Sequence, residues 1–284
     1  EIADKYNSLQ SALAGAERLV PLLEEEDRQI ANEVPHEFKH IESIDFDHVW
    51  FSYDNNDVYA LEDFTLSIKS GEFIGIVGPS GSGKSTLLSL LMGLYKPTKG
   101  AIYINDIDIA NYDSSVLRHL MGYVFQQAYL FKGSIKDNLT LFDTSISFDD
   151  MVDAAKQVNL DNMIEQLPEG YNTPVGYLGS LLSDGQKQLL AFGRTLIRKT
   201  PILLLDEATA NIDSHTEKQI QASIENIRGT KTIVSIAHRL STVQDANKIV
   251  YMEYGKIIES GSFDKLINSK GAFYNLWSNQ QSGS

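Results

Sequence analysis

The chain has 284 residues, of which 42% are hydrophobic, and this suits a globular protein of one or two domains with a sizeable core. Its formal net charge of −14 argues against a general nucleic-acid surface, because phosphate backbones are bound by basic patches. The chain has no cysteine, which excludes disulfides, thiolate metal sites and a cysteine nucleophile.

The first forty residues are predicted to form a helix and a linker. Apolar side chains at 2–23 share one helical face, and Pro35 breaks the chain before the next element. Residues 36–40 read HEFKH and match the H-E-x-x-H zinc motif, which needs both histidines on one face of a helix. Because Pro35 precedes them and a strand-like alternation follows at once, we expect a linker with two exposed histidines and not a zinc site.

A glycine-rich loop follows a predicted buried strand at 72–77. Residues 78–86 read GPSGSGKST, which fits G-x-x-x-x-G-K-[ST], and leucines at helical spacing come next. This is the context of a P-loop, whose backbone N–H groups cradle phosphates at a helix N-terminus; the alternative is a glycine-rich turn without ligand. We expect Lys84 to reach the β- and γ-phosphates and Ser85 to bind Mg²⁺. The predicted phosphate-binding set is Gly78, Pro79, Ser80, Gly81, Ser82, Gly83, Lys84, Ser85 and Thr86.

The rest of the chain alternates strands and helices. Strands are predicted at 41–53, 64–69, 101–104, 121–124, 202–205, 230–236, 248–252 and 256–258. Helices are predicted at 148–167, 183–198, 263–268 and 273–277. Such alternation indicates an α/β fold with a parallel-sheet core.

Two acidic residues follow the most apolar of these strands. Residues 202–205 are four consecutive aliphatics, as expected of a central parallel strand that is buried on both faces. The strand ends at Asp206 and Glu207, hereafter the acidic pair. We expect Asp206 to hold Mg²⁺ through water and Glu207 to polarise the attacking water. Combined with the P-loop upstream, the pair indicates a nucleotide-hydrolysing site.

Four further stretches complete a family pattern. They are YVFQQAYLF around Gln126, LSDGQ at 182–186, ATANID ending at Asp213, and TIVSIAHRLS containing His238. In this order, with the P-loop and the acidic pair, they resemble the nucleotide-binding domain of an ABC transporter over about residues 41–280. The resemblance implies a P-loop NTPase (RecA-like) parallel-sheet core, an antiparallel β subdomain, and an α-helical signature subdomain at about 127–198.

The resemblance also implies roles for single residues. Tyr53 would stack on the adenine of ATP, its alternative being an ordinary outward strand aromatic. Gln126 would contact Mg²⁺ and the attacking water, and His238 would hydrogen-bond the γ-phosphate. In the family, two such domains enclose two ATP molecules head to tail, so part of each site comes from the other subunit. The residues expected to act in trans on the second subunit's ATP, or to meet that subunit, are Ser183, Gly185, Gln186 and Asp213.

Two stretches narrow the subtype to an exporter. QSALAGAERLVPLLEE resembles the cytoplasmic end of the last transmembrane helix of ABC exporters, with an ordinary amphipathic helix as the alternative. LFKGSIKDNL resembles the exporter stretch that faces the coupling helices of the membrane domain. We therefore expect residues 1–40 to be a helix end plus linker, and 41–284 to be the nucleotide-binding domain of an exporter fragment. Its place would be the cytoplasmic face of the cell membrane, beside a transmembrane domain and a second ABC subunit.

Two alternative functions stay open. The first is a nucleotide-gated dimerisation module with little turnover, which the presence of both Glu207 and His238 disfavours. The second is the ATPase subunit of an ABC importer, which would usually lack the N-terminal helix. A soluble ABC protein of DNA repair or translation is disfavoured, because the chain has one P-loop and no room for a long coiled coil.

The signature departs from the family pattern LSGGQ. Asp184 replaces the first glycine, and Tyr177 replaces the usual glutamate of a preceding loop. A carboxylate ~6 Å from a partner's γ-phosphate would cost on the order of 3 kcal/mol per unit-charge pair at an effective dielectric of ~20. Alternatively, Asp184 points away and favours its helix N-terminus by under about 1 kcal/mol. An intact Glu207 combined with this altered signature resembles the catalytic-glutamate chain of a heterodimeric exporter, in which the other chain supplies a consensus signature.

Overall fold

The computed structural model describes residues 41–54, 58–207, 212–237 and 239–282. All of these belong to one compact unit of the chain, residues 35–284. The helix predicted at 2–23, the HEFKH segment and His238 lie outside the described residues. Within the described ranges, no helix combines the length and apolar character that crossing a membrane requires.

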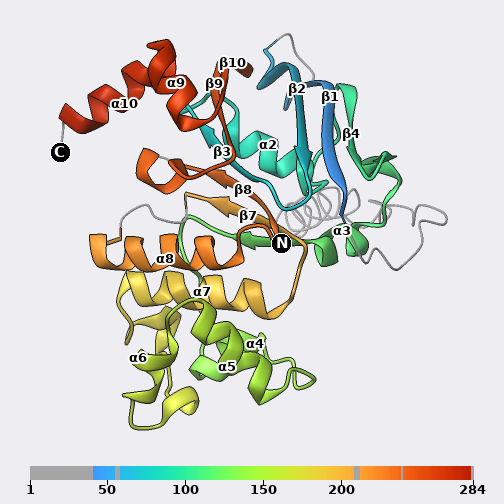
Figure 1. Cartoon of the computed structure of the whole chain (residues 1–284). Helices are drawn as coiled ribbons and strands as arrows, with labels where there is room; N and C mark the ends of the chain where they lie inside the picture. Colours follow the sequence, from blue (N-terminus) through green and yellow to red (C-terminus); the bar gives the residue numbers. More distant parts are fainter. Residues whose placement is uncertain (1–40, 55–57, 208–211, 238, 283–284) are drawn as a thin grey trace, which may run out of the picture. The chain divides into compact units, whose positions relative to one another are not determined.

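The larger sheet runs in the order β10-β9-β3-β8-β7-β6 (Figure 1). Its strands are β3 (Phe73–Val77), β6 (Met121–Val124), β7 (Ile202–Asp206), β8 (Thr232–Ile236), β9 (Lys248–Glu253) and β10 (Lys256–Gly261). All neighbours pair in parallel except β10, which is antiparallel to β9. Every residue of β3 and β8 is buried, as expected of strands covered on both faces. The predicted parallel core is confirmed.

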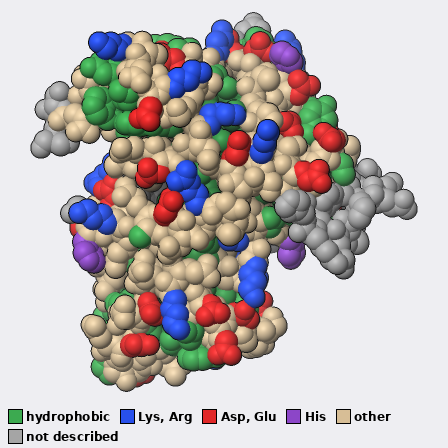
Figure 2. All heavy atoms as spheres, viewed as in Figure 1, with side chains coloured by type: hydrophobic (Ala, Val, Ile, Leu, Met, Phe, Trp, Pro, Cys, Tyr) green, Lys and Arg blue, Asp and Glu red, His purple; other side chains and the backbone are tan. Residues whose placement is uncertain are grey.

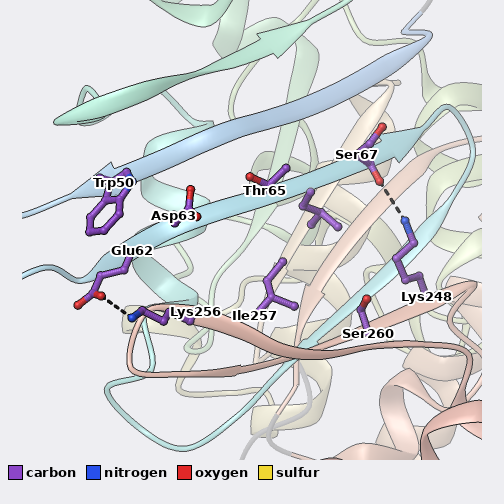
Figure 3. Close-up of a pocket in the computed structure, with 10 residues that line it drawn as sticks. Trp50, Glu62, Asp63, Thr65, Ser67, Lys248, Lys256, Ile257 and Ser260 are labelled. Carbon is purple, nitrogen blue, oxygen red and sulfur yellow. Dashed lines mark hydrogen bonds and ion pairs between the residues drawn. The ribbon is translucent and has the colours of Figure 1, made fainter.

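The smaller sheet is antiparallel and runs in the order β2-β1-β4-β5. Its strands are β1 (Ser43–Phe51), β2 (Leu61–Lys69), β4 (Lys99–Ile104) and β5 (Ile107–Asp108). The edge strands of the two sheets, β2 and β10, flank a groove of ≈ 590 Å³ (Figure 3). The Lys256–Glu62 ion pair (2.8 Å) bridges the groove near one end, and Lys248 Nζ donates to the Ser67 carbonyl (3.1 Å) near the other. These contacts join the two sheets.

Helices cover the larger sheet and form a group beyond it. They are α2 (Lys84–Leu91), α3 (Ser114–Leu120), α4 (Ile135–Thr140), α5 (Phe148–Gln157), α6 (Asp161–Glu165), α7 (Asp184–Ile197), α8 (Ser214–Ile227), α9 (Phe263–Ser269) and α10 (Ala272–Ser282). Short 3₁₀ helices are η1 (Ile109–Asn111), η2 (Gly170–Asn172), η3 (Tyr177–Gly179) and η4 (Leu240–Val243). Helix α7 packs on β6 and α8 on one side and on α4 and α5 on the other (Figure 1). The site residues of α7 are thereby placed between the sheet and the helical group.

One predicted helix is corrected. The periodicity at 148–167 predicts a single helix, but α5 ends at Gln157 and α6 begins at Asp161. Between them Asn159 adopts a left-handed backbone conformation (φ 57°), which a continuing α-helix cannot contain. Both segments keep their apolar side chains in the same core, so the sequence pattern continues across the break.

Acidic and basic side chains are interspersed on the face drawn in Figure 2. Opposite charges meet in several exposed pairs, including Lys199–Asp150 and Arg228–Glu225. Exposed pairs of this kind each contribute little, typically below about 1 kcal/mol. On this face, acidic side chains are therefore mixed with basic ones.

Candidate active site

The loop between β3 and α2 is shaped by three glycines with positive φ. A Cβ on Gly78 would overlap the carbonyl oxygen of Met252, and a Cβ on Gly83 would overlap that of Ala60. Gly81, in contrast, has φ 79° and no atom within 4 Å of its ideal Cβ position. The loop therefore lies against the protein at its two ends and is open in the middle, as a backbone cradle for an anion requires.

Lys84 is folded back over this loop. Its ammonium donates to the carbonyls of Gly78 (2.9 Å) and Pro79 (2.8 Å), and the side chain is buried. Burial lowers the pKa of Lys84, and the negative charges of Glu207 and Asp206 partly offset this effect. The predicted phosphate-binding ammonium therefore lies close to the acidic pair.

The loop also holds a buried hydroxyl for which the described residues provide no hydrogen-bond partner, that of Ser82. Its backbone is satisfied, because Ser82 N donates to Pro79 O (3.3 Å) and Ser82 O accepts from Gly255 N (3.2 Å). A buried unpaired hydroxyl costs about 1–3 kcal/mol, which a phosphate oxygen would remove. Together with the open cradle at Gly81, this donor fits a bound phosphate chain.

The acidic pair is held by two side chains from β6 and the loop after it. Tyr123 donates its hydroxyl to Asp206 Oδ2 (2.7 Å), and Gln126 donates Nε2 to Glu207 Oε2 (2.6 Å). Burial, followed by the bond to Asp206, raises the pKa of Tyr123 well above its ordinary value, so its hydroxyl stays protonated at neutral pH. Glu207 has φ 50°, and its N–H donates to Ile236 O of β8 (3.0 Å). The carboxylates thus leave the end of β7 in fixed directions.

The predicted metal ligands are oxygen donors from three segments. Ser85, which is exposed, supplies a hydroxyl from the first turn of α2, Asp206 supplies a carboxylate at the end of β7, and Gln126 supplies an amide after β6. Mg²⁺ prefers such hard oxygen ligands, and it usually takes one or two carboxylates plus substrate phosphates and water. The donor set therefore fits Mg²⁺ bound together with a nucleotide.

Tyr53, just after β1, is held by its hydroxyl and by its ring edges. The hydroxyl bonds Thr86 Oγ1 (2.9 Å), and the ring makes edge-to-face contacts with Phe51 (4.8 Å) and Tyr95 (5.3 Å). The side chain nevertheless remains 54% exposed. This arrangement ties a solvent-facing ring to the first turn of α2, where a stacking residue beside the P-loop is predicted.

The predicted signature begins α7. Ser183 Oγ accepts from Gln186 N (3.2 Å), while Gln186 Oε1 accepts from Ser183 N (2.9 Å), which is a capping box. A Cβ on Gly185 would lie 2.8 Å from Thr216 Cγ2 and 2.9 Å from Thr216 Cβ. Gly185 is therefore needed for the close approach of α7 to α8, apart from any role toward a nucleotide.

Asp213 fixes the start of α8, the helix that α7 approaches at Gly185. It caps α8 by accepting from His215 N (3.0 Å), Thr216 N (3.0 Å) and Thr216 Oγ1 (2.7 Å). The hydrogen bonds from Thr216 lower the pKa of Asp213. Because Thr216 also packs against Gly185, the predicted D-loop aspartate and the signature share one contact.

A model of the ABC transporter family matches residues 61–210, more than half of the chain. The matched stretch contains the P-loop, the signature and the acidic pair. The chain belongs to the ABC transporter family. Its ATP-binding domain is homologous to the nucleotide-binding domains of exporters, and the family hydrolyses ATP to drive transport.

Individual relatives of this chain agree with the family match. The putative ABC transporter ATP-binding protein exp8 of Streptococcus pneumoniae is 40% identical over 280 residues, covering 99% of this chain and 48% of the relative. A putative multidrug export ATP-binding/permease protein of Staphylococcus aureus is 41% identical over 237 residues, covering 84% and 41%. A solved bacterial Atm1-family ABC exporter with ATP bound has a TM-score of 0.84 at 35% identity, covering 97% and 48%. The chain spans about half the length of the curated relatives it matches.

The substituted position in this ABC signature is paired within its own helix. Asp184 Oδ1 bonds Lys187 Nζ (2.9 Å), and the Asp184 side chain is 79% exposed. Tyr177, the second departure from the family pattern, is exposed as well. Both substituted side chains are therefore available at the surface near the start of α7.

Three residues near the ABC site were missed by sequence reasoning. They are Tyr123, Tyr95 and Gln188, whose buried Nε2 donates to Phe125 O (2.9 Å). Gln188 thereby fixes the backbone just before Gln126 to the signature helix. Tyr123 had a sequence signal, since it is the polar-ended side chain of an otherwise apolar strand three residues before Gln126.

Proposed function

We propose that this chain binds Mg-ATP at its P-loop and hydrolyses it when the signature of a second ABC subunit completes the site. The observation that carries the proposal is the placement of Glu207. It leaves the end of β7 with Gln126 on its carboxylate, and its charge acts on Lys84 of the P-loop. The proposed base and the phosphate-binding cation therefore lie within range of each other's charge.

Each residue has a defined task in this reaction. The loop N–H groups, the Ser82 hydroxyl and Lys84 bind the β- and γ-phosphates. Ser85, Asp206 and Gln126 would hold Mg²⁺, which when bound supplies positive charge against the phosphate oxygens. Glu207 orients the attacking water and accepts its proton while the water oxygen bonds to the γ-phosphorus and the bond to the β-phosphate oxygen breaks. The products are ADP and inorganic phosphate, and His238 stays predicted to bond the γ-phosphate.

The second subunit completes the site in trans. The capping box of Ser183 and Gln186 fixes the N-terminus of the 14-residue helix α7, whose dipole and free N–H groups favour an anion. Ser183, Gly185 and Gln186 would face the partner's γ-phosphate, with Asp213 at the contact between subunits. Enclosure by two subunits excludes water and surrounds a highly charged transition state with donors.

The transmembrane partner is proposed to bind a cavity of ≈ 620 Å³ beside the loop of Gln126. We call it the aromatic cavity, and its lining includes Tyr123, Phe125, Tyr129, Phe131 and Arg194. Phe125, Tyr129 and Phe131 are exposed in this chain. The occupant we propose is a helical end from the transmembrane domain of an exporter, because the relatives are about twice as long as this chain. The domain would then lie at the cytoplasmic face of the membrane.

The altered signature supports a heterodimer with a consensus partner. Asp184 is exposed at the first position of α7, so its charge would face an anion bound at that helix end. Its bond to Lys187 offsets only part of this charge, because the Asp184 carboxylate is exposed to water. The chain would then hydrolyse ATP at its own P-loop, facing the partner's signature, and its own signature would complete a slower site.

The test is Mg-ATP hydrolysis measured against chain concentration for the natural chain, Glu207→Gln and Asp184→Gly. A rate that rises with the square of concentration and is lost in Glu207→Gln would support a competent homodimeric site. ATP binding without turnover, with turnover restored by Asp184→Gly, would support the need for a consensus partner. A chain that binds no ATP in any form would overturn the proposed function.

A further inference from the structure

One short segment holds both members of the acidic pair. Tyr123 bonds Asp206 and, three residues later, Gln126 bonds Glu207, so the end of β6 and its following loop contact the carboxylates in order. The role of Gln126 is expected from the family resemblance. Tyr123 has no role in that expectation, yet its bond goes to the carboxylate that the proposed function assigns to Mg²⁺.

Strand register explains why Tyr123 reaches Asp206. Tyr123 is paired with Leu204 in the parallel β6–β7 ladder, and Asp206 lies two residues beyond Leu204. Side chains two residues apart on a strand share a face, so Tyr123 and Asp206 point to the same side of the sheet. The tyrosine ring spans the remaining distance along the strand and places its hydroxyl at 2.7 Å from Oδ2.

The segment that carries Tyr123 is fixed by a hydrogen bond from the signature helix α7. Gln188 of the signature helix is buried and donates to the carbonyl of Phe125 (2.9 Å). The ring of Tyr123 also packs on the ring of Phe125, with centroids 4.5 Å apart. A hydroxyl held by both its strand and its neighbouring ring can orient a carboxylate without being displaced by it.

We propose that Tyr123 is a positioning residue for the Mg²⁺ site, holding Asp206 Oδ2 so that the other carboxylate oxygen faces the metal's water. The inference rests on the proposed function, since it assigns Asp206 to the metal. It adds Tyr123 to that site. The effect of Tyr123 on nucleotide binding should depend on the presence of the metal. Groups that orient metal-bound carboxylates typically change metal affinity by 10- to 100-fold when removed.

The experiment measures binding of adenylyl imidodiphosphate, a non-hydrolysable ATP analogue, by calorimetry in excess Mg²⁺ and again in EDTA. The Kd in EDTA divided by the Kd in excess Mg²⁺ reports how much the metal contributes to binding. Tyr123→Phe removes only the hydroxyl, and we expect it to lower this ratio by about 10-fold. Its Kd in EDTA should stay that of the natural chain.

The matched control is Tyr112→Phe, which also removes one tyrosine hydroxyl with a hydrogen bond. That hydroxyl donates to Ile104 O (2.9 Å) in the antiparallel sheet, and burial raises the pKa of Tyr112 to about 12. We expect the control to leave the ratio unchanged, even if both variants unfold at a somewhat lower temperature. A loss common to the two variants would therefore reflect stability and not the metal.

The outcomes separate this inference from the proposed function. If the natural chain binds the analogue in neither condition, the proposed function fails. If the natural chain shows a metal-dependent ratio and Tyr123→Phe keeps or raises it, the positioning role of Tyr123 is overturned. A Tyr123→Phe chain that loses binding in EDTA as well would make the hydroxyl structural and overturn the role too.

Discussion

At the scale of single residues, the adenine side of the proposed site depends on one ring. Tyr53 is anchored by Thr86 at its hydroxyl and by Phe51 and Tyr95 at its edges, while more than half of it remains exposed. We expect Tyr53→Ala to weaken ATP binding by about 1–3 kcal/mol, the usual value of a base–aromatic stack. This corresponds to roughly 5- to 150-fold in Kd, measured by calorimetry.

Two variants separate stacking from anchoring. Tyr53→Phe keeps the ring and loses only the bond to Thr86, so its loss should stay near 1 kcal/mol or below. Phe148→Ala removes another exposed aromatic, whose ring contacts Tyr171 in the helical group, and should leave the Kd unchanged. Equal ATP affinity in Tyr53→Ala and the natural chain would contradict a stacking role.

At the scale of elements, the start of the signature helix depends on the approach of α7 to α8 at Gly185. A methyl group there would lie 2.8 Å from Thr216 Cγ2, and Thr216 is fixed by two hydrogen bonds to Asp213. We expect Gly185→Ala to lower the free energy of unfolding by about 1–3 kcal/mol, the usual cost of overpacking. This loss should appear although alanine favours a helix by roughly 1 kcal/mol over glycine. Urea denaturation measures it.

The same helix offers a matched control. A Cβ on Gly193 would lie 3.1 Å from Leu139 Cδ2 and 3.3 Å from Val158 Cγ2, which are ends of side chains that can shift. Gly193→Ala should therefore be close to neutral. Adding Thr216→Ala to Gly185→Ala should recover part of the loss, because it removes Thr216 Oγ1 and Cγ2, two of the three atoms nearest to the added methyl group. Two equally stable glycine variants would refute this account of the helix contact.

Elements also differ in how far the sequence predicts them. Strands β3 and β7 were predictable because both are unbroken apolar runs next to a motif, and their motifs placed Lys84, Asp206 and Glu207 correctly on the fold. Helix α8 was not predicted, although Ile220, Ile224 and Ile227 have helical spacing and Asp213 precedes them as an N-cap residue.

Other features left little trace in the sequence. The break between α5 and α6 depends on the left-handed backbone of Asn159, while the apolar periodicity continues across it. Likewise, the bond between Tyr123 and Asp206 depends on which strands are neighbours and on their register, which periodicity within one strand does not report. The roles of the trans residues and of His238 stay predictions.

At the scale of the whole molecule, the proposed transporter needs a path between membrane domain and nucleotide. Three features of one segment make such a path: the aromatic cavity, the bonds from Tyr123 and Gln126 to the acidic pair, and the bond from Gln188 of the signature helix to Phe125 O. A helix seated in the cavity would therefore touch the same segment that orients both carboxylates and would also act on α7.

A charged residue introduced at the aromatic cavity tests this path in the full-length transporter. Tyr129 is 61% exposed. Its ring lies beside that of Phe131 at the aromatic cavity, with ring centroids 6.1 Å apart. We expect Tyr129→Asp to reduce ATPase activity of the assembled transporter several-fold, because a buried carboxylate opposes docking of an apolar helix end. The isolated chain should keep its ATP affinity and unfolding temperature. Phe148→Asp, the same change at an exposed aromatic outside this cavity, should leave the assembled rate unchanged, and equal rates in both variants would reject the cavity as the docking site.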